Sequence, residues 1–469
     1  MKLIYDVEDR MSFGKMIVFA IQQLLAIMAA TLVVPMIVGH GMKSEAALFG
    51  AGVGTLVYIA FTKKKSPVFL GSSFAFLGSM AAAFAGGVSA AVGYLGLILG
   101  AIFAGLVYVV IALVVKAVGV DWVNKLMPPV VIGPTVAIIG LSLAGNAIGD
   151  LKSGEVFVKE VVDGVEVSTQ LASPIATILC GLVTLFVTIL CSTFGKKTLK
   201  LIPFIIGILA GYAVALVMTL IGNAAGIDAL KVMSFDSLTA LFKTADGSFG
   251  ITLKTFVSVP EFTFMTAFGG FEEITGAYIG TIAVAYVPVA FVVFAEHIAD
   301  HKNISSIIER DLLKEPGLSR TLLGDGVGSM AGAFFGGCPN TTYGESVGCV
   351  AITRNASIVT IITAACGAIL ISFLSPFVAF VNSIPSCVMG GVCMALYGFI
   401  AVSGLKMLQK VDLGQNKNLF TASVILISGI GGLSVSFGKV TLTSIACALI
   451  LGIIVNVMLS GAKDEETEE

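Results

Sequence analysis

Glu296 and Glu345 are carboxylates in apolar parts of the chain, where a charge is costly. Glu296 follows the run AVAYVPVAFVVFA, and Glu345 lies in PNTTYGES, residues 339–346, within the apolar second half. An ionisable residue inside a membrane span marks by default a ligand pathway or a proton relay. A carboxylate accepts N–H groups from a ligand, and a buried one can exchange a proton. The alternatives are that Glu345 only caps a helix and that Glu296 lies in water beyond its span.

Three further polar residues could take part in proton transfer. Asp300 follows Glu296 at spacing i, i+4, which places both side chains on one helix face. Asp325 lies among the glycines of LLGDGVGSMAGAFFGG as a relay member or a cap, and these glycines favour close helix packing. Gln22 and Gln23 lie in the first apolar run, and we expect one of them to face the same pocket as Glu296.

Metal, cofactor and enzyme chemistry have little support in the sequence. His297 and His301 have a zinc-compatible i, i+4 spacing, but the H-E-x-x-H pattern is absent. The eight cysteines lie mostly in apolar runs without paired spacing, so we interpret them as small buried hydrophobes. We find no nucleophile–base pair and no phosphate loop in a plausible setting. We therefore expect no metal, no cofactor and no catalytic residue.

The composition indicates a polytopic membrane protein. Of 469 residues, 57% are hydrophobic and 12% are charged, whereas soluble domains have about 25% charged residues. The net charge of −2 gives no indication of nucleic-acid binding. The first apolar run is too long for a signal-peptide core, so we interpret it as a retained span.

The apolar runs predict an all-α protein with fourteen membrane spans in two groups of seven. The spans are expected near 15–38, 46–62, 68–83, 93–118, 128–147, 174–193, 200–222, 281–300, 321–337, 340–354, 357–379, 384–404, 418–434 and 440–460. The third and the tenth are short and polar. Two long segments are predicted outside: 148–173, which reads as a hairpin with an Asp-Gly turn, and about 223–280, which joins the halves.

The positive charges support this count. With the N-terminus in the cytoplasm, the cationic clusters fall on alternate loops, as the positive-inside rule requires. Both termini are then cytoplasmic. The clusters are Lys63–Lys65, Lys116, Lys125, Lys196, Lys197, Lys200, Arg310, Lys314, Arg320, Arg354, Lys406, Lys410 and Lys417. Because seven is odd, two structural repeats of seven spans must be inverted, as in many secondary transporters.

The third and tenth spans are predicted to be broken. Pro339 disfavours helix before it, Thr341 to Tyr343 prefer extended backbone, and Gly344 permits unusual torsions. Extended backbone at membrane depth must pair or line a cavity. We expect 340–344 to pair antiparallel with Leu70–Phe74, each strand leading to a half-helix whose positive N-terminus faces one pocket. A planar ring with alternating C=O and N–H edges would fit such a site.

These residues together carry a family resemblance. The stretches QQLLAIMAATLVVP, FLGSSFAF, FAEHIADHKN and GGCPNTTYGESVGCVAITR are similar to those of the nucleobase–ascorbate transporter (uracil–xanthine permease) family, and within it to bacterial uracil permeases. The resemblance covers the chain apart from the termini and the two long outer segments. It implies fourteen spans as inverted repeats, with a core domain from 15–118 and 281–379 and a gate domain from 128–222 and 384–460. It also implies proton- or sodium-coupled symport, a homodimer and an elevator-like movement in the cytoplasmic membrane.

The resemblance also implies a set of site residues. Glu296 and Glu345 would hold the base, and the extended part of span three would add backbone at Ser73 and the aromatic face of Phe74. Gly344 would contribute backbone, with Tyr343 beside it. Protons would be handled by Glu296, Gln23, Asp300 and Asp325.

The chain departs from the family pattern at two of these positions. A well-known uracil permease has histidine where this chain has Gln23 and Asp300, and the purine branch often has aspartate at the latter. The purine branch usually has glutamine where this chain has Glu345, which favours uracil. We therefore expect a proton-coupled uracil importer surrounded by membrane lipid. A xanthine or uric acid permease is the alternative within the family, and an anion transporter or channel is the alternative outside it.

Overall fold

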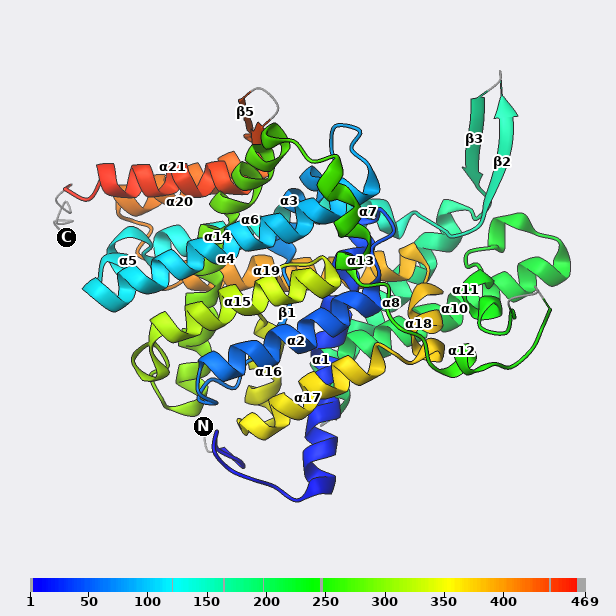
Figure 1. The fold of residues 1–469 in the computed structure, drawn as a ribbon, viewed down its shortest axis with the longest axis horizontal. Coiled ribbons are helices and arrows are strands. Elements are labelled where there is room, and N and C mark those ends of the chain that lie inside the picture. Colours follow the sequence, from blue (N-terminus) through cyan, green and yellow to red (C-terminus); the bar gives the residue numbers. More distant parts are fainter. Residues whose placement is uncertain are drawn as a thin grey trace.

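Helices form most of the protein (Figure 1). The computed structural model describes residues 3–119, 121–162, 165–196, 198–244, 248–437 and 440–461. The first half contains α1 (Phe13–Val38), α2 (Ser44–Phe61), β1 (Leu70–Ser72), η1 (Phe74–Phe76), α3 (Leu77–Ala83), α4 (Ala90–Val118), α5 (Asp121–Leu126), α6 (Pro129–Ser142), α7 (Ala144–Leu151), β2 (Phe157–Val162), β3 (Val165–Gln170), α8 (Pro174–Phe194), α9 (Thr198–Leu201) and α10 (Pro203–Ala225).

A linker of short helices leads to the second half. The linker contains η2 (Asp228–Leu230), α11 (Asp236–Ala240), α12 (Leu253–Phe256), α13 (Thr263–Ala267) and η3 (Phe268–Glu272). The second half contains α14 (Gly276–Ile308), the π-helical turn η4 (Leu313–Gly317), α15 (Leu318–Gly336), β4 (Asn340–Thr342), α16 (Gly344–Thr353), α17 (Ile358–Ile371), α18 (Ser375–Asn382), α19 (Ser386–Leu408), α20 (Asn416–Ile430), β5 (Val435–Phe437), β6 (Val440–Leu442) and α21 (Ser444–Met458).

Eight helices of the described chain are long and apolar enough to cross a membrane. They coincide with the predicted spans one, two, four to eight and twelve, and shorter apolar helices occupy spans three, eleven and fourteen. A transmembrane helix needs about 20 apolar residues. The prediction of an all-α multi-pass membrane protein is therefore confirmed.

The structure differs from the sequence prediction at an end of two spans, whereas the predicted outer hairpin is present as far as it is described. Helix α14 runs to Ile308 rather than residue 300, so Glu296 lies well inside a helix and not at its end. The predicted span 440–460 is wrong at its start, because β6 pairs with β5 and the helix begins only at Ser444. In the predicted outer hairpin, β2 and β3 pair antiparallel, whereas its Asp-Gly turn at 163–164 lies outside the described residues.

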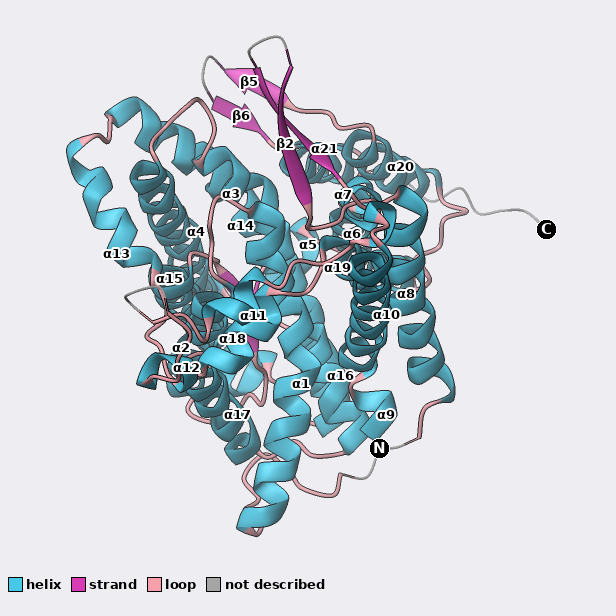
Figure 2. Ribbon diagram, turned by 90° about the vertical axis from the view of Figure 1, so that its right-hand side faces the viewer, coloured by secondary structure: helices cyan, strands magenta, loops and turns pink. Residues whose placement is uncertain are grey.

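Two three-residue strands lie among the helices (Figure 2). β1 pairs antiparallel with β4, and Leu70, Gly71 and Ser72 face Thr342, Thr341 and Asn340. The ladder is extended by the N–H of Ser73, which donates to Pro339 O over 2.9 Å. Because both strands are fully buried, this pairing satisfies backbone groups that no water can reach.

Glycine spacing lets α2 and α15 approach each other closely. Gly50 and Gly54 on α2 face Gly328, Gly332 and Gly336 on α15, with each helix presenting glycines four residues apart. A Cβ at Gly50 would lie 2.4 Å from Gly332 O, and one at Gly54 would lie 2.7 Å from Gly328 O. The prediction that these glycines serve close packing is confirmed, and Asp325 is carried on the same tightly packed helix.

Gly50→Ala is expected to lower the thermal stability of the purified protein. The added methyl must displace the backbone of α15, and overpacking of this kind costs about 1–3 kcal/mol. Gly280→Ala is the matched control, because Gly280 is an exposed helical glycine with nothing within 4 Å of its would-be Cβ. There the change should be neutral or stabilising by up to about 1 kcal/mol. Thermal unfolding in detergent measures both, and equal midpoints would contradict this packing argument.

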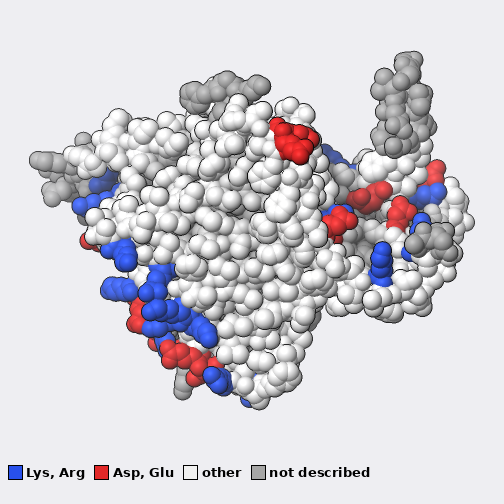
Figure 3. All heavy atoms as spheres, in the orientation of Figure 1, with Lys and Arg blue, Asp and Glu red and all other residues white. Residues whose placement is uncertain are grey.

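The loops predicted to lie in the cytoplasm meet on one side of the protein. Arg310 contacts Asp6 over 2.6 Å, and Ile4 N–H donates to Arg354 O over 2.8 Å. Lys65 forms a short hydrogen bond to Glu315 that holds the pKa of this exposed carboxyl below its usual value. Figure 3 shows lysine and arginine side chains gathered along this edge, whereas most of the surface above it is uncharged.

Candidate substrate site

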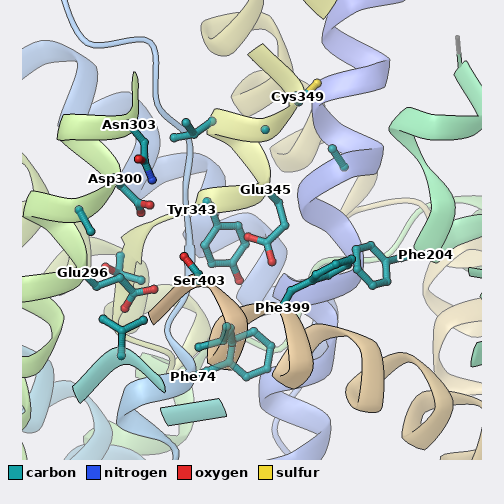
Figure 4. A pocket seen from close by; sticks show the side chains of 18 of the residues that line it. Phe74, Phe204, Glu296, Asp300, Asn303, Tyr343, Glu345, Cys349, Phe399 and Ser403 are labelled. Carbon is teal, nitrogen blue, oxygen red and sulfur yellow. The ribbon is translucent and has the colours of Figure 1, made fainter. Parts of the chain in front are cut away.

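A cavity of about 400 Å³ contains both predicted carboxylates. One wall comes from α1, η1, α14, β4 and α16, and the facing wall comes from α6, α8, α9, α10 and α19 (Figure 4). The first wall includes Ala26, Phe74, Glu296, Asp300, Asn303, Thr341, Tyr343, Gly344 and Glu345, and the second includes Val136, Ser192, Lys200, Phe204, Phe399, Ser403 and Met407. The site therefore lies between two groups of helices.

The strand pair positions Glu345. β4 ends at Thr342, Tyr343 caps the next helix with extended backbone, and α16 begins at Gly344. Glu345 thus lies in the first turn, where the helix dipole favours a negative charge. Gly344 lines the cavity and has no side chain, so the backbone at the start of α16 borders this space. Figure 4 shows the carboxyl groups of Glu345 and Glu296 both pointing into this space.

Asp300 lies one turn after Glu296 and connects α14 to the strands. Its Oδ2 accepts a hydrogen bond from Thr342 Oγ1 over 2.9 Å. The contact joins the helix that carries Glu296 to the segment that carries Glu345. Thr342 was not predicted as a site residue, because a threonine in a strand gives no sequence signal for its partner.

Tyr343 lines the cavity and fixes the strand pair. Its hydroxyl donates to Ser72 O over 2.8 Å, and Thr31 Oγ1 lies 3.5 Å from it. The ring covers Gly71, where a Cβ would lie only 2.3 Å from the ring carbons. Gly71 is therefore required by the close approach of the tyrosine rather than by its backbone torsions.

Phe74 forms an aromatic wall of the cavity. It is 8% exposed, and its ring meets that of Tyr397 on α19 edge-on, with centroids 5.7 Å apart. This contact bridges the two walls. Ser73 is fully buried and is not among the residues that line the cavity, and its N–H is bonded to Pro339 O.

Gln23 is also set back from the cavity. Its Nε2 donates to Ser346 Oγ over 2.5 Å, and the same oxygen accepts the N–H of Phe69 over 3.0 Å. Gln23 therefore connects α1 to the first turn of α16 and to the segment before β1. From α1, Ala26 lines the cavity.

Behind the cavity, His297 and Asp325 form a fully buried pair. His297 Nδ1 lies 2.6 Å from Asp325 Oδ2, and its Nε2 lies 3.0 Å from Thr321 Oγ1. Thr321 donates its hydroxyl proton to Leu318 O, so it accepts from Nε2–H of the histidine. One proton is then shared between Nδ1 and Oδ2, and the pair is neutral as a whole. Asp325 Oδ1 is buried without a hydrogen-bond partner among the described residues.

His301 is held in one tautomer. Its Nδ1 donates to His297 O over 2.8 Å, which leaves Nε2 to accept from the hydroxyl of Tyr58 over 2.7 Å. Tyr58 in turn accepts from Ser66 Oγ over 2.6 Å. All four ring nitrogens of His297 and His301 therefore have hydrogen-bond partners within the protein.

The comparisons with known proteins place the chain in a family. A family model described as a permease family matches residues 14–437. The chain belongs to this permease family. The resemblance to the nucleobase–ascorbate transporters is thereby confirmed, and the protein is a membrane transporter rather than an enzyme.

Several members of this permease family match almost the whole chain. The uracil permease of Bacillus caldolyticus is 38% identical over 467 residues, covering 98% of this chain and 95% of that protein. The uracil permease of Bacillus subtilis is 37% identical over 455 residues, covering 96% of this chain and 94% of that protein.

Solved structures share the fold at low sequence identity. The transmembrane domain of a cyanobacterium bicarbonate transporter, BicA, has a TM-score of 0.60 at 14% identity and covers 96% of this chain and 99% of that chain. The murine anion transporter Slc26a9, in the inward-facing state, has a TM-score of 0.63 at 9% identity and covers 97% of this chain and 69% of that chain. This permease therefore has the fold of known membrane transporters.

The sequence did not predict the cavity wall that faces the carboxylates in this permease. Phe204 on α10 and Phe399 on α19 meet edge-on with centroids 5.9 Å apart, and Figure 4 shows both beside the cavity. Ser403 lies on the same helix as Phe399. These residues occur in uniformly apolar or small-residue runs, where no pattern distinguishes a cavity wall from a lipid-facing surface.

Proposed function

We propose that this permease is a proton-coupled uracil symporter of the cytoplasmic membrane. The observation that carries the proposal is one cavity that contains the carboxyl groups of Glu296 and Glu345 together with the N-terminus of a half-helix. This combination offers acceptors for N–H groups and donors for carbonyl oxygens, and uracil has both along one ring edge. The relatives named uracil permeases support the same substrate.

In the proposed complex, Glu345 and Glu296 accept the two ring N–H groups. The backbone N–H groups near Phe74 and Gly344 donate to the ring carbonyls, and Phe74 packs on the ring face. Tyr343 holds the strands in register. Ser73 supports the site from behind, because its backbone N–H bonds to Pro339 O and so fixes the chain just before Phe74. The remaining proton-coupling candidates are Asp300, Asp325 and Gln23, and the first two contact neighbouring polar groups on or beside α14.

The architecture supports alternating access between two domains. We propose fourteen spans as two inverted repeats, with a core from 15–118 and 281–379 and a gate from 128–222 and 384–460. The cavity lies where helices of these two groups face each other. An elevator-like displacement of the core along the gate would carry the base across, and we expect a homodimer of this unit.

The cavity reaches the side that carries the cationic loops. Lys200, Asn303 and Met407 line it close to the ends of α9, α14 and α19 on that side. If these loops and both termini are cytoplasmic, as the positive-inside rule requires, the structure is inward-facing. The base would then leave past Phe399 and Phe204.

Two alternatives can be separated by substrate. A xanthine or uric acid permease would use the same carboxylates on a larger ring. An anion transporter would use the half-helix dipole alone, and the solved structures with this fold are named as bicarbonate and anion transporters. The carboxyl groups of Glu296, Asp300 and Glu345, which all line the cavity, disfavour an anionic substrate by charge repulsion.

Uracil uptake is expected to depend on the proton gradient. In a strain that lacks its own uracil permeases, initial uptake should be several-fold faster at acidic than at alkaline external pH, because an inward proton gradient drives symport. An uncoupler should reduce accumulation to near the external concentration. Radiolabelled uracil measures both.

Competition by unlabelled bases tests the substrate in the same assay. Excess uracil should block uptake, whereas xanthine should compete poorly. If the rate of uptake did not depend on the proton gradient, proton coupling would be contradicted. Stronger competition by xanthine than by uracil would favour the purine alternative. A conductance without any base, measured under voltage clamp, would favour the anion alternative.

A further inference from the structure

Tyr108 is a buried tyrosine on α4 with an unpaired hydroxyl. The residue is 5% exposed, and its hydroxyl oxygen has no hydrogen-bond partner among the described residues. An unpaired polar group inside a protein is destabilising, so each one calls for an explanation. No described residue of α4 lines the substrate cavity, so any part that Tyr108 plays in transport must act through another residue.

A close approach of α4 and α15 brings Tyr108 beside Asp325. A Cβ at Gly326, the residue after Asp325, would lie 2.9 Å from the Cβ of Tyr108 and 3.0 Å from Gly105 O. The Tyr108 ring also meets the ring of His297 edge-on, with centroids 6.2 Å apart. Tyr108 is therefore a neighbour of both members of the buried pair, and Asp325 Oδ1 is itself unpaired there.

Other ionisable groups surround this pair on three sides. The groups close enough to Asp325 to interact with it electrostatically are Glu296 and Asp300 on α14, Tyr58 on α2 and Tyr108 on α4. The two tyrosines differ in one respect. The Tyr58 hydroxyl is bonded to Ser66 and His301, whereas the Tyr108 hydroxyl is unpaired. Tyr108 is therefore the tyrosine that still has a proton to donate.

Asp325 needs a donor when the pair loses its shared proton. Because Nε2–H of His297 is directed at Thr321, loss of that proton leaves Nδ1 with a lone pair that faces Oδ2 only 2.6 Å away. A buried carboxylate without a hydrogen-bond donor is strongly destabilised. A hydroxyl that donates to Oδ1 offsets part of this cost.

We propose that Tyr108 is a positioning residue for proton coupling. When the shared proton leaves the pair for the carboxylate of Glu296, Asp325 becomes the anion and Glu296 becomes neutral. The Tyr108 hydroxyl then donates to Oδ1 of Asp325, directly or through one water. It thereby sets the pH at which the pair loses its proton. This role rests on the proposed function, because it requires protons to be carried with the base.

The test is exchange of labelled for unlabelled uracil in proteoliposomes with the same pH on both sides. Exchange by a symporter needs the protonated carrier, so the rate should decline as the pH rises and the pair loses its proton. Tyr108→Phe keeps the ring but removes the donor, which destabilises the anion. The midpoint of the decline should therefore move to higher pH by about one unit. A midpoint does not depend on how much of the variant is folded.

Tyr286→Phe is the matched control. Tyr286 is also fully buried with an unpaired hydroxyl, but its ring stacks on Phe76 and covers Gly100. This variant should keep the wild-type midpoint. Tyr108→Phe should also have no effect on the pH dependence when it is added to Asp325→Asn, because that variant has no proton to lose at this position.

An unchanged midpoint in Tyr108→Phe would overturn this role and leave the proposed function standing. Exchange reduced equally at every pH would overturn it as well, since a purely structural defect gives that result. A shift that persists in the Asp325→Asn background would assign the hydroxyl to another acid and contradict the proposal. Absence of uracil exchange in the wild type would overturn the proposed function, and this role with it.

Discussion

Glu345→Gln is expected to reduce uracil uptake about 10- to 100-fold at low substrate concentration. The carboxyl group of Glu345 points into the cavity from the first turn of α16, where it can accept a ring N–H. A hydrogen bond to a charged group contributes about 1.5–3 kcal/mol, and each 1.4 kcal/mol is a factor of 10. Glutamine has nearly the same shape but offers a neutral oxygen and an NH₂ group, which opposes the ring N–H. Initial rates of labelled uracil uptake, normalised to the amount of protein in the membrane, measure the effect.

Glu261→Gln is the control for this substitution. Glu261 is an exposed carboxylate that pairs with Lys43 over 3.2 Å outside the cavity. Its loss should leave uptake close to that of the wild type. Unchanged uptake in Glu345→Gln would show that this carboxylate does not hold the base, and the remaining candidate in the cavity would be Glu296.

The broken spans could be predicted because their signals are local. Pro339, Thr341 and Thr342 favour extended backbone, and a membrane leaves such a segment few ways to satisfy its N–H and C=O groups. The partner strand at Leu70 followed from the equivalent position in the other half. The structure has both strands at these places and pairs them antiparallel.

Side-chain partners could not be predicted in the same way. Asp300 bonds to Thr342, and Gln23 bonds to Ser346, across large sequence separations and between elements whose relative rotation the sequence leaves open. The facing wall of the cavity could not be predicted from the sequence, because Phe204 and Phe399 lie in apolar helices that could equally face lipid. In this chain hydrophobicity is nearly uniform, so the periodicity that normally reveals a buried face is weak.

The length of α14 shows a related limit. A span was expected to end near residue 300, where charged residues become frequent, but the helix continues to Ile308. His297, Asp300 and His301 are buried there, because they bond to Asp325, Thr342 and Tyr58. Polar residues therefore mark an internal network rather than the end of the helix.

Asp325→Asn is expected to abolish uracil accumulation while exchange continues. The hydrogen bonds around His297 leave one proton between its Nδ1 and Asp325 Oδ2, in a fully buried neutral pair beside Glu296. Asparagine keeps the size and a hydrogen bond to the ring but cannot release or take up that proton. Net symport needs a proton to bind and leave in each cycle, whereas exchange of bound uracil for free uracil does not. Accumulation in energised cells should fall at least about 10-fold, which corresponds to about 1.4 kcal/mol of lost driving force.

Exchange distinguishes this role from a purely structural one. Proteoliposomes loaded with unlabelled uracil should take up labelled uracil at a rate near that of the wild type, with no imposed gradient. Asp311→Asn is the control, because Asp311 is an exposed aspartate outside the cavity, 3.5 Å from Lys314, and the variant should keep both activities. Loss of exchange together with accumulation would make Asp325 a residue that supports binding through the position of α14. Normal accumulation would leave Glu296 and Asp300, the two acids of the cavity on α14, as the carriers of the proton.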